Sequence, residues 1–284
     1  MALKKSAGDE LSRITDKMEQ DEQRQIDLNT PSTDEDGIVR DVPLLAGYLD
    51  PETGVLHDTF SYREMDGKDE EAISKADVRS NSAKLANVLC ERCVLSIGTI
   101  DKKEVGAKKW GEIIRSMYGG DIDYMMLKIR EISKGTEVVF THKCPNCGQK
   151  LTTIVDTSEF NIREFNGLRE VPFTLHKGYA DNHGGFLKEG VFHLPTGRDR
   201  EIVIPAIRKN PSTAATILMT RCITFNDGTK PTQGRIAEMV LRDRKVIEDI
   251  MKENTFGIDT TIDDLTCDSC GQSISGEIGQ SDFF

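Results

Sequence analysis

The sequence predicts an α+β fold in which one small unit, made of helices and a β-hairpin, occurs twice in tandem. Short motifs follow one another in the same order in both halves of the chain. Each half also ends on a Cys-x-x-Cys-Gly motif next to strand-like runs, such as the alternating Val138 and Phe140. Repeated order is typical of a duplicated unit, and alternation with a period of two is typical of half-buried strands.

The repeated motifs begin with glycine, a basic residue, aspartate, any residue and glutamate, at residues 67–71 and 197–201. An Arg-Cys pair near the end of an apolar helix follows in each half, at Arg92-Cys93 and Arg221-Cys222. A glycine and the cysteine motif come last, and the separation between matching motifs changes mainly once, in a loop, from 130 residues at Gly67 and Gly197 to 123 at Cys144 and Cys267. We therefore predict a tandem duplication, with a first unit at residues 43–165 and a second at 166–284.

The first unit is expected to begin with extended chain that glycine-containing turns interrupt. Asp121 suits the N-cap of a helix, because its carboxylate can accept a hydrogen bond from a free N–H of the first turn. The predicted elements are extended chain at residues 44–62, a short helix after the Gly-basic-Asp motif, helices at 81–96, 107–117 and 121–133, and strands at 136–141 and 150–156.

The second unit is expected to follow the same plan, with its last two helices fused into one. A short helix again follows the Gly-basic-Asp motif, and a hairpin again carries the cysteine motif at its tip. The other predicted elements are extended chain at residues 171–194, helices at 212–223 and 235–253, and strands at 258–265 and 273–278.

Residues 1–42 are predicted to form a flexible, acidic arm, because they include no aromatic residue and cannot build a core alone. Leu11, Ile14 and Met18 fall at i, i+3 and i+7, and would share one face of a helix. Two interpretations stay open: a disordered tail, or a partner-binding helix that orders only when it docks through these three residues.

The two Cys-x-x-Cys-Gly motifs indicate a metal site. Cys144 and Cys147 in the first motif, with Cys267 and Cys270 in the second, would supply the four sulfur ligands of a tetrahedral Zn²⁺. A complete four-thiolate shell leaves no open position, so the zinc is expected to be structural and ribbon-like. The alternatives are unliganded thiols or one disulfide within each motif. His142 could replace a ligand, although a single histidine near a motif is a weak signal.

A third Cys-x-x-Cys pair, Cys90 and Cys93, lies inside a predicted helix. A thioredoxin-like redox pair would stand at a helix N-terminus after a strand, whereas this pair stands near the end of an apolar helix. The second unit keeps a single cysteine at this place, Cys222. We interpret Cys93 and Cys222 as core residues and Cys90 as incidental, with a redox or metal role as the alternative.

Composition and motifs exclude several classes of function. The net charge of −11 argues against a nucleic-acid partner, and no apolar run reaches the length of about 18 residues that a membrane span requires. The five histidines form no catalytic or metal-ligand pattern, and the chain has neither a dinucleotide-binding nor a Walker motif. The acidic runs at residues 69–71 and 263–264 are interpreted as solvated ends of a helix and a strand. The sequence therefore predicts a protein that is not an enzyme.

Taken in order, the motifs resemble those of the T-even-type phage baseplate family, the hub and hub-assembly proteins of contractile tails and related contractile injection systems. The resemblance covers residue 43 to about residue 280 and rests on the ordered set, since no single motif is specific. The matching stretches are Gly47-Tyr48-Leu49-Asp50, Gly67–Glu71, Cys93-Val94, Lys128-Ile129-Arg130, Cys144–Gly148, Leu194–Asp199 and Cys267–Gly271.

The resemblance implies a non-enzymatic structural or chaperone-like assembly protein of a phage tail baseplate or hub. Its partners would be other tail, baseplate or hub proteins, and a homo-oligomer stays open. Assembly would take place in the host cytoplasm, with retention in the virion tail as a further option. The alternatives are a cytosolic zinc-ribbon adaptor of transcription or translation, which would normally carry a basic patch, and a redox protein that uses Cys90 and Cys93.

Overall fold

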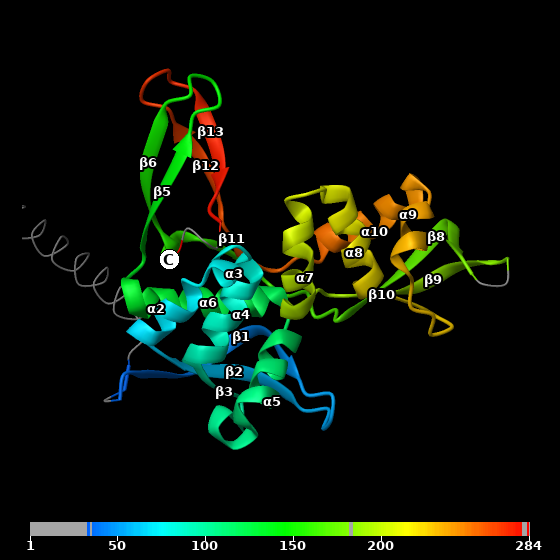
Figure 1. Cartoon of the computed structure of the whole chain (residues 1–284), viewed down its shortest axis with the longest axis horizontal. Helices are drawn as coiled ribbons and strands as arrows, with labels where there is room; N and C mark the ends of the chain where they lie inside the picture. Colours follow the sequence, from blue (N-terminus) through cyan, green and yellow to red (C-terminus); the bar gives the residue numbers. More distant parts are fainter. Residues whose placement is uncertain (1–32, 35, 182–183, 280–282, 284) are drawn as a thin grey trace, which may run out of the picture. The chain divides into compact units, whose positions relative to one another are not determined.

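The structure is a computed structural model that describes residues 33–34, 36–181, 184–279 and 283. Arg40–Phe284 form one compact unit. In the described residues before it, the Gly37 N–H donates to the Asp34 carbonyl at 2.9 Å in a turn. The predicted docking residues Leu11, Ile14 and Met18 lie outside the described residues. The α+β class is confirmed, because the compact unit mixes helices and strands throughout (Figure 1).

The first half of the compact unit packs helices against a sheet with the strand order β1-β2-β3-β4. Asn81 caps α4 by accepting a hydrogen bond from the Lys84 N–H at 3.1 Å. α4 ends at Cys93 because Val94 is extended (φ −74°, ψ 132°) and begins the next strand. The elements are β1 (Ile38–Leu49), β2 (Leu56–Arg63), α2 (Gly67–Ile73), α3 (Ala76–Arg79), α4 (Ser82–Cys93), β3 (Val94–Ile97), β4 (Ile100–Asp101), α5 (Lys102–Ser116) and α6 (Gly119–Lys134).

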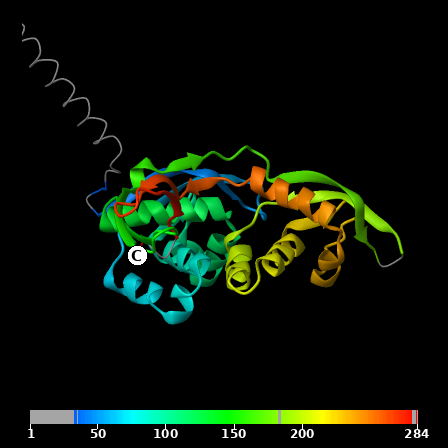
Figure 2. The ribbon, with the colours of Figure 1, turned by 90° about the horizontal axis from the view of Figure 1, so that it is seen from above.

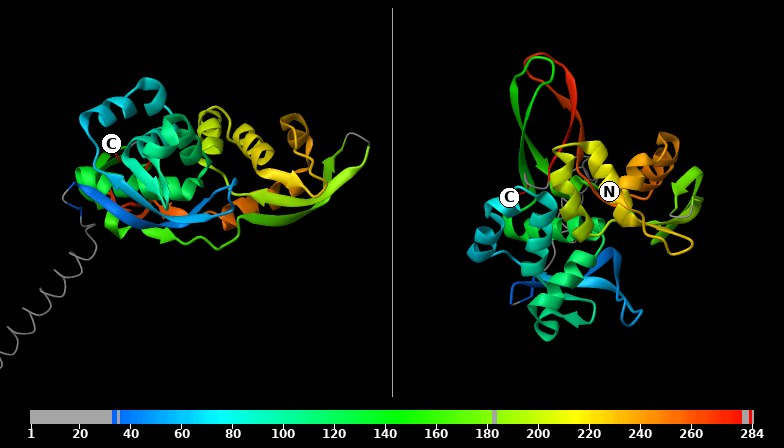
Figure 3. Two further views of the ribbon diagram at one scale, coloured as in Figure 1. Left: turned by 90° about the horizontal axis from the view of Figure 1, so that it is seen from below. Right: turned by 45° about the vertical axis from the view of Figure 1, so that its right-hand side comes forward.

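The second half shows nearly the same order of elements, with a sheet of order β10-β9-β8. Asn210 caps α8 by accepting from the Ser212 and Thr213 N–H groups at 3.0 and 3.2 Å, as Asn81 caps α4. Helices lie on one face of the strands in this half and in the first (Figures 2 and 3). The elements are β8 (Glu170–Ala180), β9 (Phe186–His193), α7 (Gly197–Ile207), α8 (Pro211–Cys222), β10 (Ile223–Phe225), α9 (Gln233–Glu238) and α10 (Leu241–Glu253).

Two β-hairpins, one after each half, stand side by side and away from the helices (Figures 1 and 3). At their base the second half returns to the first, where β11 pairs with β7 in antiparallel register from Gly257–Arg163 to Asp259–Asn161. A short 3-10 helix, η1 (Thr157–Glu159), precedes β7. The elements are β5 (Glu137–Lys143), β6 (Lys150–Asp156), β7 (Asn161–Arg163), β11 (Gly257–Asp259), β12 (Thr261–Thr266) and β13 (Ser273–Glu277).

Each half buries its own apolar core, but the tips of the hairpins bury very little. Phe60 and Tyr62 stack at 5.0 Å between centroids in the first core, while Phe192 and Met219 are buried in the second. The hairpin cluster of buried residues contains only Cys144, Cys267 and Ile274. Two-stranded hairpins are marginally stable in water, so this part of the molecule needs another source of stability.

Two predicted details of the helices are wrong. The helix expected at residues 235–253 is two helices, because Met239 and Val240 are extended (ψ 141° and 143°) and separate α9 from α10. The predicted N-cap role of Asp121 is also wrong. The N-cap of α6 is Tyr118, and the Asp121 carboxylate instead accepts hydrogen bonds from the Leu45 and Ala46 N–H groups of β1 at 2.8 and 3.0 Å.

Candidate metal centre

The two cysteine motifs form matching turns at the tips of the paired hairpins. In the first, the Cys144 N–H donates to the Gln149 carbonyl at 2.8 Å and the Gly148 N–H to the Cys144 carbonyl at 2.9 Å. In the second, the same bonds join Cys267 to Gln272 at 2.9 Å and Gly271 to Cys267 at 2.8 Å. Gly148 and Gly271 have φ of +73° and +68°, the left-handed region that glycine adopts without strain.

The four sulfur atoms of Cys144, Cys147, Cys267 and Cys270 all lie within 4.8 Å of one another. Cys144 Sγ lies 3.7 Å from Cys270 Sγ, and Cys147 Sγ lies 3.7 Å from Cys267 Sγ. Four Zn–S bonds of about 2.3 Å at tetrahedral angles would separate the sulfurs by about 3.8 Å. The spacing therefore fits a tetrahedral ion shared by both motifs. All four cysteines are free thiols, which disagrees with one disulfide within each motif.

The four cysteines differ in their exposure to water and in the ionisation of their thiols. Cys144 and Cys267 are buried, whereas Cys147 and Cys270 are exposed. The Asn146 amide donates to Cys270 Sγ at 3.6 Å, and this hydrogen bond lowers the pKa of the Cys270 thiol to about 6. At Cys147 a hydrogen bond from the Gln149 backbone is outweighed by burial and by hydrogen bonds to the other three sulfurs, which raise the pKa of that thiol to about 12. A thiolate at neutral pH is the form that binds a metal.

His142 does not belong to the cluster, although sequence reasoning named it as a substitute ligand. Its ring stacks on Phe140 with centroids 5.1 Å apart. Among the described residues, the four cysteines are the one group of side chains close enough to hold a metal ion. Their sulfurs alone complete a tetrahedral shell, so the arrangement suits a structural ion better than a catalytic one.

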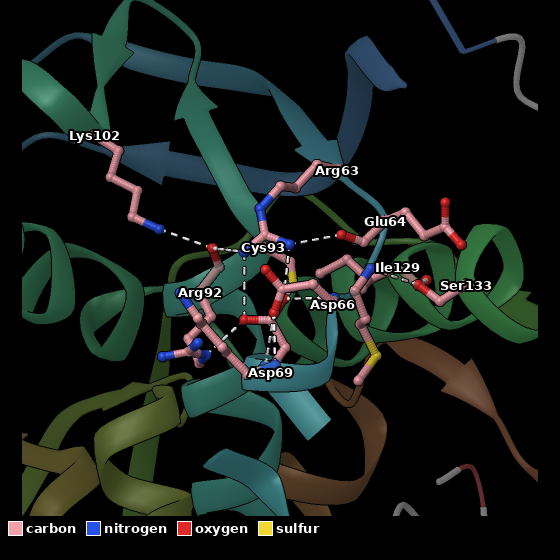
Figure 4. Close-up of polar contacts among 11 residues, drawn as sticks. Arg63, Glu64, Asp66, Asp69, Arg92, Cys93, Lys102, Ile129 and Ser133 are labelled. Atoms are coloured by element: carbon pink, nitrogen blue, oxygen red, sulfur yellow. Dashed lines mark hydrogen bonds and ion pairs between the residues drawn. The ribbon is translucent and has the colours of Figure 1, made fainter. Parts of the chain in front are cut away.

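A second polar centre, which the sequence analysis missed, surrounds Asp69 at the start of α2 (Figure 4). The Asp69 side chain is fully buried and accepts from Arg63 Nη1 at 2.7 Å and from Arg92 Nε at 2.6 Å. Asp66 and Asp69 form a capping box, in which each side chain accepts from the other's backbone N–H at 3.0 Å. Asp69 is therefore a buried anchor between α2, α4 and β2, and its interpretation as part of a solvated helix end is wrong.

The ionisation of Asp69 follows from these contacts. Burial opposes the charged form, but the hydrogen bonds from Arg63, the Asp66 N–H and Arg92 together hold the pKa of Asp69 well below its usual range. The signal that could have identified this residue is the spacing of Asp66 and Asp69, three apart at the start of a helix, as in a capping box. The two arginines come from other elements, so the sequence alone did not reveal them.

The buried cysteines give no support to a redox site. Cys90 and Cys93 are completely buried, and Cys222 is nearly so. Burial raises the pKa of Cys90 well above its ordinary value, and burial together with the charge of Asp69 raises the pKa of Cys93 to about 12. A reactive cysteine would need an accessible thiol with a lowered pKa.

Asp121 and Asp243 each stand in the first turn of the last helix before a hairpin, α6 and α10. Asp121 Oδ1 accepts both of the hydrogen bonds from β1, and its buried Oδ2 has no hydrogen-bond partner among the described residues. Asp243 accepts from three N–H groups of β8: those of His176 at 2.7 Å, Lys177 at 3.0 Å and Gly178 at 2.8 Å. These carboxylates therefore attach a helix to the first strand of each half.

Comparison with known proteins gives one match. A family model described as T4 bacteriophage base plate protein matches residues 51–183. No curated protein and no solved structure matches the chain. Within the described part of the chain, no helix has the length and apolar character needed to cross a membrane. The matched stretch contains the Asp69 anchor, Asp121 and the first cysteine motif, and this part of the chain is therefore similar to the T4-type phage baseplate protein family.

Proposed function

We propose that this protein is a non-enzymatic structural or assembly protein of a phage tail baseplate or hub, and that one structural zinc ion fastens its two hairpins together. The observation that carries the proposal is the convergence of four sulfurs within 4.8 Å from two distant motifs, in a chain that matches the baseplate family. Its partners would be other tail, baseplate or hub proteins, met in the host cytoplasm during assembly.

Zinc is the ion that the ligands favour. Four thiolates are soft ligands, and tetrahedral sulfur sites in proteins hold zinc or iron–sulfur centres. The hairpin tips bury only a small cluster, so metal-binding free energy would supply stability that the apolar contacts there lack. Cys147 and Cys267 are 120 residues apart in the sequence, and Cys144 and Cys270 are 126 residues apart. An ion bound by all four would therefore join the two halves.

The zinc proposal is tested by elemental analysis of the purified full chain. We expect one zinc per chain, and we expect Cys144→Ser and Cys267→Ser each to lose the ion and several kcal/mol of stability. Ser269→Ala is the matched control, because it alters an exposed residue of the same turn and removes no sulfur. Full zinc occupancy in Cys267→Ser would show that the two motifs do not share an ion.

The baseplate role is tested by following the protein through assembly. Tagged protein should co-purify with tail or baseplate components from infected cells, and loss of the protein should leave incomplete tails. Mass spectrometry of purified particles would then separate a retained component from an assembly factor that departs. The acidic arm, with Leu11, Ile14 and Met18, is proposed as one contact. Its deletion should weaken association while zinc content stays unchanged.

The two halves are further proposed to be a tandem duplication, with units at residues 43–165 and 166–284. Matching contacts support this. Arg92 Nε lies 2.6 Å from Asp69 in the first half, and Arg221 Nε lies 2.6 Å from Asp199 in the second. Thr196 and Asp199 also form a capping box at the start of α7, as Asp66 and Asp69 do for α2. An experimental structure in which the halves fail to superpose would refute the duplication.

A further inference from the structure

The first half and the second half meet along a defined contact. Tyr118 and Thr196 form an antiparallel bridge, in which the Gly119 N–H donates to the Pro195 carbonyl at 3.0 Å and the Gly197 N–H to the Met117 carbonyl at 2.9 Å. We call the surface at the start of α6, with Asn87 of α4, the receiving face. The start of α7 that packs on it is the inserting face.

Side chains complete this contact. Arg200 Nη1 of the inserting face lies 2.8 Å from Asp123 Oδ2 of the receiving face. The Asn87 amide donates to the Gly197 carbonyl at 3.1 Å and to Glu201 Oε2 at 3.0 Å. The packing is close: a Cβ added to Gly197 would lie 2.4 Å from Asn87, and a Cβ added to Gly119 would lie 2.4 Å from Arg200.

The matching order of elements assigns one more face of each kind. α10 occupies the place of α6, with Leu241 and Lys245 where α6 has Gly119 and Asp123. α2 occupies the place of α7, with Gly67 and Glu70 where α7 has Gly197 and Arg200. The second half thus carries its own receiving face on α10, and the first half its own inserting face on α2.

Both of these further faces are open. Leu241 is 82% exposed, whereas Gly119 at the matching place lies under Arg200. A Cβ added to Gly67 would meet no atom within 4 Å. Figure 1 shows α2 on the side of the first half that faces away from α7. An exposed leucine at the start of α10 is what we expect of a receiving face that has no partner within its own chain.

The charges on the open faces are complementary, with the signs exchanged. The internal contact pairs Arg200 on the inserting face with Asp123 on the receiving face. The open faces carry Glu70 on the inserting side and Lys245 on the receiving side. Glu70 forms no ion pair within the described residues, and Lys245 pairs only with the exposed Asp249 at 2.9 Å. An exposed pair of this kind contributes little stability, so Lys245 can exchange its partner at low cost.

We propose that a second copy of this chain binds head to tail, with α2 of one copy seated on α10 of the next, so that Glu70 meets Lys245 and Leu241 is covered. The inference rests on the proposed duplication, because the internal contact is its template. Such a contact joins two different surfaces, so repetition builds a ring or an open filament. The exchanged signs also prevent α2 from competing for the internal receiving face, since Glu70 would there meet Asp123.

The test is sedimentation velocity of the zinc-loaded full chain over a range of concentrations at low salt. Wild type should self-associate, and Glu70→Lys or Lys245→Glu alone should weaken self-association about tenfold or more, because like charges then face each other. An equimolar mixture of these two variants should recover it, since each remaining contact pairs opposite charges. Leu241→Asp should abolish association.

Phe186→Asp is the control, because it changes a residue that is also exposed, at 50%, on a different surface, the β8–β9 hairpin. It should associate like wild type. A wild-type chain that stays monomeric at every concentration would overturn the proposal, as would failure of the mixture to recover association. Zinc content measured on the same samples keeps this outcome separate from failure of the metal proposal, and an experimental structure tests the duplication independently.

Discussion

Asp121 in the first half and Asp243 in the second both bind backbone N–H groups of the first strand of their half, yet their pKa values shift in opposite directions. Burial dominates at Asp121 and raises its pKa, because the hydrogen bonds from the backbone of β1 and the charge of Arg169 do not offset it. At Asp243 burial also opposes ionisation, but three N–H donors shared between both oxygens outweigh it and lower the pKa.

The same attachment is therefore made by two buried carboxylates, and ionisation is disfavoured in one half and favoured in the other. The balance between burial and the hydrogen bonds from the backbone, which differs between the two sites, decides which charge state is favoured. Asp69 and Asp199 differ in a related way. Asp69 is fully buried between two arginines, whereas Asp199 is 13% exposed and pairs with Arg221 alone. His193 stands where the first half has Arg63, and it lies 3.4 Å from Glu170 instead.

The largest expected effect comes from exchanging these carboxylates for amides. Asp243→Asn should lower the free energy of unfolding by about 3 kcal/mol, because the new NH₂ group would face backbone N–H donors that lose their acceptor. Asp121→Asn should cost less than about 1 kcal/mol, since the amide nitrogen can take the place of an oxygen that has no partner. Urea denaturation at pH 7 measures both. Equal losses in the free energy of unfolding would contradict this explanation, in which only Asp121 has a carboxylate oxygen without a hydrogen-bond partner among the described residues.

The two capping-box aspartates should differ by a smaller amount. Asp69→Asn should cost about 2 kcal/mol, because two arginines lose a buried partner that carries the opposite charge. Asp199→Asn should cost about 1 kcal/mol, since one arginine is involved and the site is partly open to water. Glu71→Gln, two residues further along α2 and exposed, is the control for loss of charge alone. Thermal unfolding of the zinc-loaded chains gives the ranking, and a larger loss for Asp199→Asn would contradict it.

The matching helix-start glycines provide a third comparison. Gly197→Ala should destabilise by about 1–2 kcal/mol, because its Cβ would lie 2.4 Å from both Asn87 and Ile122 in the contact between the halves. Gly67→Ala should stay within about 0.5 kcal/mol of wild type, since the same atom meets open space. Similar losses for both would show that the backbone at this position, and not the contact, rejects a side chain.

The smallest effect is in the pH dependence. The pKa of Asp243 is lowered, so its contribution is present above about pH 3.9 and is lost as the pH falls. The cost of Asp243→Asn should therefore shrink on acidification. The pKa of Asp121 is raised, so its contribution is largest in acid and falls as the pH rises. The cost of Asp121→Asn should shrink as the pH rises toward neutrality, by less than about 1 kcal/mol.

Protonation of the thiols at low pH would release the metal from variant and wild type alike. The difference in the free energy of unfolding between variant and wild type at each pH is therefore free of this common effect. Parallel trends for Asp121→Asn and Asp243→Asn would show that the two carboxylates titrate alike in the folded protein. That outcome would contradict the opposite shifts on which the comparison rests.

Local patterns predicted well the features that depend on neighbouring residues. Alternation identified the strands around Cys144, and the helix predicted to begin at residue 81 starts within one residue of α4. The sequence failed where distant residues decide. Asp69 looks like one of three solvated acids until Arg92 is seen beside it, and Asp121 has the chemistry of an N-cap but binds β1. The break between α9 and α10 at Met239 carries no glycine or proline that would signal it.

The candidate metal centre was accessible to sequence reasoning because glycine-flanked Cys-x-x-Cys turns are specific and sulfur has few other uses at such spacing. That both motifs would converge was an expectation drawn from the need for four ligands, and the structure brings the sulfurs within 4.8 Å. The open faces on α2 and α10 could not be read from sequence, because exposure of Leu241 depends on what packs around it.

The separation of the cysteine motifs along the chain also affects the order of events on the ribosome. Cys144 and Cys147 emerge early and offer a metal ion only two ligands, while Cys267 emerges after the whole second half has been synthesised. Closing the long loop between the two motifs has an entropic cost, which only binding of the metal by all four cysteines would offset. A chain that ends before Cys267 lacks two of these ligands. The centre can therefore form only once the second half has been translated, and a prematurely terminated chain would display a pair of unsatisfied thiols that quality-control machinery could recognise.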